Sequence, residues 1–255
     1  TVTLTDAGAV TGNANVETYV LADGGGTTFT LGADAQNVTT GNGADIVDVG
    51  TRTATGTFTT VAADTIKLGN GADVKGVDSG AGAGGAFTAN TLELASGASV
   101  TMTAAQNNSF TSATAAGTET IAISDANDAT GLATIETYTL AAGTQTFTLG
   151  ATGQNVTADS TGATGAITID TSTFTSVTGT FDDNSGNDTI ALTLSQDGVN
   201  ISSANTTDVD TIALANNVGA TMTRAQDAKI NAATGTNTVT LTDAGAVTGN
   251  ANVET

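Results

Sequence analysis

Glycines and carboxylates recur together at three places in this chain. The segments are Gly41-Asn-Gly43-Ala-Asp45-Ile46-Val47, Gly69-Asn-Gly71-Ala-Asp73-Val74 and Asp183-Asn-Ser-Gly186-Asn-Asp188-Thr-Ile190. Glycine lets the backbone turn tightly and point its carbonyl oxygens inward, and the aspartate adds a carboxylate to the same turn. The apolar residue that follows anchors the next strand in a hydrophobic core. Such turns offer the oxygen ligands that a hard cation prefers.

All three segments resemble the calcium-binding nonapeptide of RTX proteins, G-G-x-G-x-D-x-U-x. The resemblance implies calcium as a cofactor, an ion that takes six to eight oxygen ligands at about 2.3–2.6 Å. It implies carboxylate ligands from Asp45, Asp73, Asp183 and Asp188, helped by carbonyl oxygens near Gly43, Gly71 and Gly186.

The motifs depart from the RTX pattern in two ways. RTX nonapeptides stack in tandem and hold each ion between two successive turns, whereas here the motifs are isolated and the first glycine is missing or replaced. An isolated motif supplies about half of a cage. The alternative is a plain Asx-type turn, in which the aspartate accepts hydrogen bonds from backbone N–H groups.

Catalytic chemistry has few residues to work with. The chain has no His and no Cys, which excludes Ser-His-Asp and Cys-His arrangements. Two carboxylates could cleave a glycosidic bond, and Asp182 with Asp183 is the nearest such pair. The sugar-stacking aromatic residues are sparse, with seven Phe, two Tyr and no Trp. We expect no enzyme, and we keep a carbohydrate-binding or polysaccharide-processing module as the alternative function.

The elements that position these residues are short strands. Apolar residues alternate with Thr or Ser in bursts such as Val2-Thr-Leu4, Phe29-Thr-Leu31 and Ile190-Ala-Leu192, and clusters of Gly, Asn and Asp separate the bursts. This period of two predicts strands with one buried face. Helical turns are expected only at residues 113–116 and 227–233.

The chain repeats itself. Residues 1–18 and 238–255 both read TVTLTDAGAVTGNANVET, so the pattern that begins at Thr1 begins again at Thr238, one full period later. A looser half-period of about 118 residues matches Val16-Glu-Thr-Tyr19 with Ile135-Glu-Thr-Tyr138, and Gln36-Asn-Val-Thr39 with Gln154-Asn-Val-Thr157. The predicted organisation is therefore one repeat at residues 1–118, a second at 119–237, and the start of the next at 238–255.

A finer step runs inside each repeat. An acidic or amide residue, Thr and an apolar residue recur, as at Asp64-Thr-Ile66, Asn90-Thr-Leu92 and Asp188-Thr-Ile190, and the gaps suggest about five steps of roughly 24 residues per repeat. Short strands with this step predict an all-β parallel β-solenoid in which strands pair with residues about 17–30 positions away. The alternative is an array of antiparallel sandwich domains, which usually contain Pro and a Trp or Tyr core anchor.

Composition and charge restrict the partners. The net charge is −20, from 25 acidic and five basic residues, which argues against nucleic acid and anionic membrane surfaces. The chain has 32 Gly, 56 Thr and no Pro, and no apolar run reaches the eighteen residues of a membrane helix. Such a chain suits a soluble extracellular protein that binds cations.

The order of these motifs resembles the repeats of large bacterial surface proteins exported by type I secretion, including RTX-like S-layer proteins and giant adhesins. The resemblance lies in the kind of residues and the spacing of the motifs along nearly all 255 residues. It implies an extracellular, cell-surface, structural role with calcium. We expect the chain to join itself end to end, with Thr255 leading into an equivalent of Tyr19 in the same polypeptide or in the next subunit. Divalent cations could bridge neighbouring fibres.

Overall fold

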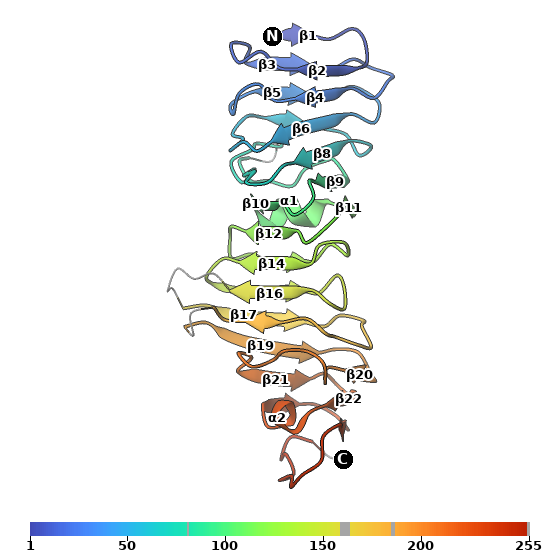
Figure 1. The fold of residues 1–255 in the computed structure, drawn as a ribbon, viewed down its shortest axis with the longest axis vertical. Coiled ribbons are helices and arrows are strands. Elements are labelled where there is room, and N and C mark those ends of the chain that lie inside the picture. Colours follow the sequence, from blue (N-terminus) through green and yellow to red (C-terminus); the bar gives the residue numbers. More distant parts are fainter. Residues whose placement is uncertain (81, 159–163, 185–186, 254–255) are drawn as a thin grey trace. The chain divides into compact units, whose positions relative to one another are not determined.

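The computed structural model describes residues 1–80, 82–158, 164–184 and 187–253, which form two compact units. Unit 1 comprises Thr1–Asp125 and Leu132–Ile135, and unit 2 comprises Ala126–Gly131 and Glu136–Thr255. The regular secondary structure of each unit is almost all short strands, stacked in parallel sheets and joined by turns, as Figure 1 shows. The expected parallel β-solenoid is confirmed.

Unit 1 coils so that successive strands alternate between two sheets. One sheet contains, in order, β1 (Val2–Thr3), β3 (Thr18–Val20), β5 (Asn37–Thr39) and β7 (Phe58–Thr59). The facing sheet contains β2 (Ala9–Thr11), β4 (Thr28–Thr30), β6 (Ile46–Gly50), β8 (Thr65–Leu68), β9 (Thr91–Leu94) and β11 (Ser112–Thr114). Farther along, β10 (Ser99–Met102) pairs with β12 (Thr120–Ile123), and helix α1 (Ala104–Ser109) follows β10.

Unit 2 repeats this plan. Its six-stranded sheet contains β13 (Ala129–Thr130), β15 (Thr144–Thr148), β17 (Ala166–Asp170), β19 (Thr189–Leu194), β21 (Thr211–Leu214) and β23 (Ile230–Ala233). The other strands are β14 (Thr137–Leu140), β16 (Asn155–Ala158) and β18 (Phe181–Asp182), then β20 (Val199–Asn200), β22 (Gly219–Met222) and β24 (Thr238–Leu241). Helix α2 (Arg224–Asp227) follows β22.

The register of the strands sets the length of a coil. Residues paired in parallel lie between 17 positions apart, as in Val2 with Tyr19, and 28 apart, as in Asp73 with Thr101. This agrees with the expected range, but many coils have a shorter step, such as the 19 positions between Ala9 and Thr28. Each unit has a six-stranded sheet, which corresponds to six coils. The expected five steps of roughly 24 residues were wrong because the recurring acidic or amide residues precede strands of both sheets, as Glu17 precedes β3 and Asp64 precedes β8.

The core consists of columns of apolar side chains, one from each coil. In unit 1 the register aligns Phe29, Val47, Ile66 and Leu92, all of which are fully buried. The residues on either side of each of these are half-buried and face away from the core, as Thr28 and Thr30 do beside Phe29. Burying each large apolar side chain contributes about 1.5–3 kcal/mol, so the alternating pattern is the main source of stability.

Buried glutamines join neighbouring coils at the corners. The Oε1 atom of Gln36 accepts the Gly32 N–H at 2.7 Å, and its Nε2 donates to the carbonyls of Asn13 at 2.8 Å and Val16 at 2.9 Å. In unit 2 the Nε2 of Gln226 donates in the same way to Ile201 at 2.9 Å. A buried amide that is satisfied on both sides fixes the corner of one coil onto the coil before it.

The two helices do not lie where the sequence predicted helical turns. Both begin after a threonine cap, Thr103 or Thr223, that forms a capping box with the glutamine three residues later. Residues 113–116 were the wrong choice, since they overlap strand β11, and the range 227–233 shares only Asp227 with α2 and continues into strand β23. The sequence signal was the capping box itself, T-x-x-Q. No helix among the described residues is long and apolar enough to span a membrane.

Candidate metal centre

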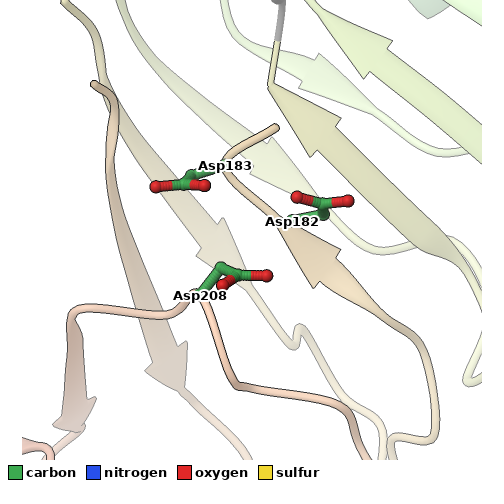
Figure 2. A group of neighbouring side chains, drawn as sticks. All are labelled: Asp182, Asp183 and Asp208. Carbon is green, nitrogen blue, oxygen red and sulfur yellow. The ribbon is translucent and has the colours of Figure 1, made fainter. Parts of the chain in front are cut away.

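Three carboxylates come together in unit 2. Asp182 ends β18, Asp183 follows it, and Asp208 lies on the next coil. The bridge between Thr180 and Asn205 sets the register, and counting three residues on from each places Asp183 level with Asp208. One oxygen from each carboxylate lies within 4.8 Å of the others, and Figure 2 shows the three half-buried side chains grouped together.

The backbone around Asp208 is held by a lysine. The Nζ of Lys229 donates to the carbonyls of Thr206 at 2.7 Å, Thr207 at 2.9 Å and Val209 at 2.6 Å. Two of these carbonyls flank Asp208 directly, so the ammonium group fixes the segment that presents the carboxylate. On the other coil, the Asn184 N–H donates to Asp182 Oδ1 at 2.7 Å.

Three negative charges at this separation repel one another, and a divalent cation would relieve the repulsion. Carboxylate oxygens are the ligands that calcium prefers, and three carboxylates offer up to six of them. The donor set of Asp182, Asp183 and Asp208 therefore fits a hard cation.

The predicted metal ligands fall in different places. Asp183 belongs to the carboxylate group, but Asp45, Asp73 and Asp188 do not join any group of three carboxylates among the described residues. Gly186 lies outside the described residues. Calcium at Asp45, Asp73 and Asp188 stays a prediction.

Asp45 has the hydrogen bonds of a turn cap. The residue is fully buried, and its two carboxylate oxygens accept the N–H groups of Thr27 at 2.6 Å and Gly41 at 3.1 Å. Gly43 and Gly71 both have positive φ, which the tight-turn interpretation requires.

Asp73 and Asp188 have other partners. Asp73 accepts the Lys75 N–H at 3.0 Å and forms an ion pair with the Lys75 ammonium at 2.5 Å. Asp188 is buried, and its Oδ1 accepts the Gly165 N–H at 2.5 Å, while its Oδ2 has no hydrogen-bond partner among the described residues.

Sequence reasoning missed Asp208. It carries no glycine motif, and only the register between two neighbouring coils brings it to Asp183. Asp182 was considered only as one of two possible catalytic carboxylates. The chain matched no model of a known protein family, no curated protein and no solved structure.

Proposed function

We propose that this chain is a structural repeat segment of a long extracellular bacterial fibre, surface layer or adhesin stalk. The coils continue from one full period into the next, either within one polypeptide or between subunits. The proposal is supported by the way the two identical stretches of sequence are used, termed here the N-copy (Thr1–Thr18) and the C-copy (Thr238–Thr255).

The two copies pair through opposite edges. In the N-copy, β1 pairs with the strand that follows it, β3, and the Leu4 N–H donates to the Val20 carbonyl at 2.8 Å. In the C-copy, β24 pairs with the preceding strand, β22, and the Thr242 N–H donates to the Met222 carbonyl at 3.0 Å. Leu4 corresponds to Leu241, the neighbour of Thr242. Successive N–H groups of a strand point to opposite edges, so one coil can make both sets of bonds together.

The same contact is made where the second half-period begins and where the next full period begins. In unit 1, Asp125 Oδ1 accepts the first N–H of α1, from Ala104, at 2.7 Å. In unit 2, Asp243 Oδ1 accepts the first N–H of α2, from Arg224, at 2.8 Å. Asp6 has the corresponding place in the N-copy. The repeat therefore has, at each half-period, an aspartate that binds the start of a helix on the preceding coil.

The charge and the carboxylate group support the extracellular, calcium-associated part of the proposal. A net charge of −20 keeps bare fibres apart, and divalent cations reduce that repulsion. The group of Asp182, Asp183 and Asp208 is the proposed calcium position. The resemblance to type I-secreted surface proteins also implies an extracellular role together with calcium.

A carbohydrate-binding module is the weaker alternative. Sugar binding on a β-helix needs exposed aromatic rings, but eight of the nine Phe and Tyr side chains are buried and Phe174 is half-buried. These rings pack in the core instead, as Tyr19 does on Phe29 with ring centroids 4.6 Å apart.

Electron microscopy of a chain with several periods tests the proposal. Twelve coils spaced by about 4.8 Å give an axial repeat of about 58 Å per period. Straight or gently twisted fibres with that repeat are expected. Separate compact particles without axial periodicity would overturn the proposed function.

A further inference from the structure

We infer that Asn200 and Asn205, in one coil of unit 2, are acceptor sites for N-linked sugars on the folded chain. N-glycosylation takes place at Asn-x-Ser/Thr motifs on protein surfaces. The ligand is a sugar from a nucleotide-activated donor, and the partner is the glycosyltransferase that transfers it. A chain rich in Asn and Thr contains such motifs by chance, so the fold must decide which of them can react. This chain has six, at Asn37, Asn107, Asn155, Asn187, Asn200 and Asn205.

Three of the six asparagines are used by regular elements of the solenoid. Asn37 and Asn155 lie in strands β5 and β16, where both are half-buried. Their Oδ1 atoms accept the N–H groups of Thr57 at 2.8 Å and Thr180 at 2.9 Å on the next coil. Asn107 lies in helix α1 and is fully buried. These side chains are committed to the fold.

Asn187 is exposed, but its motif is not a turn. The motif leads directly into strand β19, which begins at Thr189. The Thr189 N–H donates to the Gly165 carbonyl at 2.9 Å, as part of the sheet. Asn187 therefore shows what exposure provides without a turn that returns to the side-chain amide.

Asn200 and Asn205 both have such a turn. The Ser202 hydroxyl and N–H donate to Asn200 Oδ1 at 2.8 and 2.9 Å. The Thr207 hydroxyl and N–H donate to Asn205 Oδ1 at 2.8 and 3.2 Å. In each motif, the hydroxyl residue thus lies against the amide of the asparagine two positions before it.

The two turns present their amides to solvent on a fixed backbone. Asn200 and Asn205 are exposed, whereas the middle residue of each motif, Ile201 or Thr206, is buried. The Asn200 N–H donates to the Thr175 carbonyl at 2.9 Å, which attaches the turn to the preceding coil. Within the described part of the chain, neither Nδ2 atom donates a hydrogen bond. Both amide nitrogens are therefore accessible to a donor sugar.

The hydrogen bonds to Oδ1 favour the chemistry of sugar transfer. An amide nitrogen is a weak nucleophile because its lone pair is delocalised into the carbonyl group, as in a peptide bond. Two donors at Oδ1 stabilise the negative charge that develops there when Nδ2 loses a proton. Nδ2 then forms a bond to the anomeric carbon of the sugar. The bond from that carbon to the donor's diphosphate breaks, and the nucleoside diphosphate leaves with the electron pair.

Unit 1 builds the same turns without the acceptor motif. Asp73 pairs with β10, the strand before α1, and Asn200 pairs with β22, the strand before α2. Asp78 and Asn205 follow five residues later in their units. Asp73 Oδ1 accepts the Lys75 N–H at 3.0 Å, so this Asx-type turn needs neither an asparagine nor a hydroxyl residue. The presence of both in unit 2 supports a role beyond the turn.

The first test is sugar transfer to the folded full chain in vitro. The chain is incubated with an N-glycosyltransferase specific for Asn-x-Ser/Thr and with UDP-glucose, and peptide mass spectrometry locates the added hexose. Asn200 and Asn205 should each gain one hexose. The other four motifs, the exposed one at Asn187 included, should gain none. Free peptides spanning Asn37 and Asn155 should be modified, because the fold no longer occupies these side chains.

Substitutions within the two turns provide matched controls. Ser202→Ala should abolish the hexose at Asn200 and leave the one at Asn205 unchanged in the same molecule. Asn200→Asp and Asn205→Asp keep the oxygen that forms the turn, as unit 1 does, and each should lose only its own hexose. Circular dichroism checks that every variant is folded.

The second test is peptide mass spectrometry of the protein isolated from the cells that produce it, which should find sugar on Asn200 and Asn205. Unmodified asparagine at both positions in that material would overturn the inference. So would an in-vitro reaction that modifies the free peptides but neither turn, or one that modifies Asn187 equally well. None of these results changes the axial repeat expected of the fibre, so this inference and the proposed function can fail separately.

Discussion

Gly12 and Gly249 have the same place in two identical stretches of sequence, yet only Gly12 lies against a following coil. The ring of Phe29 and the amide of Gln36 leave no room for a side chain at Gly12. At Gly249 nothing in the described part of the chain requires glycine. A following coil packed on Gly249, as one packs on Gly12, would require glycine there. This supports the proposal that the coils continue.

The buried carboxylate of Asp64 should be a major source of stability in unit 1. It accepts the N–H groups of Asp45 at 2.9 Å and Val61 at 2.7 Å, and the Thr40 hydroxyl at 2.5 Å. Asp64→Ala removes the acceptor of the Asp45 and Val61 N–H groups and leaves the Thr40 hydroxyl only the Thr59 carbonyl at 3.3 Å, so it should cost about 3 kcal/mol. Urea denaturation measures this loss.

Asp23→Ala is the matched control for Asp64→Ala. Asp23 is exposed and accepts the Asn42 N–H at 2.8 Å, so its removal should cost about 1 kcal/mol or less. Equal losses in the two variants would contradict the role given to Asp64.

Calcium should stabilise unit 2 through the three carboxylates. Millimolar calcium added to EDTA-treated protein should raise the melting temperature, because the ion binds the folded state. Asp208→Asn should remove most of that increase. In EDTA the same variant should melt higher than the parent, since one of three repelling charges is gone.

Asp34→Asn is the control for the calcium experiment, because Asp34 is an exposed carboxylate paired with Arg52 outside the group. Its calcium response should equal that of the parent. A melting temperature that calcium leaves unchanged in the parent would count against a calcium site.

The ion pair of Lys67 and Glu93 should depend on pH and salt. These residues face each other on β8 and β9, with 2.9 Å between Nζ and the carboxylate, and the Glu93 carboxylate raises the pKa of Lys67 above its ordinary 10.5. A raised lysine pKa stabilises the fold below the unfolded-state value and loses that effect as pH rises through the folded-state value.

Because the Lys67–Glu93 pair is more than a third exposed, Lys67→Met should cost only about 0.2–1 kcal/mol at neutral pH. The loss should shrink in molar salt and above pH 10.5. A double-mutant cycle with Glu93→Gln checks that the effect belongs to this pair. A loss that is unaffected by salt would contradict the assignment.

Local pattern was enough to predict the parallel solenoid. Alternating bursts such as Phe29-Thr-Leu31 give the buried columns directly, and glycine-rich corners mark the turns between strands. The coil length was overestimated because residues such as Asp64 and Glu119 mark strands of different sheets. A sequence pattern shows where strands begin but not the sheet to which each belongs.

The candidate metal centre was only half predictable. Asp183 stands in a motif, but Asp208 reaches it through a coil that is longer than most of the others, as the pairing of Thr180 with Asn205 shows. The polar interior was also missed, because Asp64 and Gln36 look like turn residues until the register places them inside. The register between neighbouring coils decides both the carboxylate group and the burial of these polar residues, and no local sequence pattern specifies that register.

Hydrogen exchange at the Leu241 amide tests the continuity of the coils most directly. In the 255-residue chain this N–H is on the open edge of β24, whereas the equivalent Leu4 N–H is bonded to Val20. In a chain of two full periods, Leu241 should become protected to the same degree as Leu4, because its N–H then meets the next equivalent of Val20. A Leu241 amide that exchanges equally fast in the one-period and two-period chains would contradict the continuous solenoid.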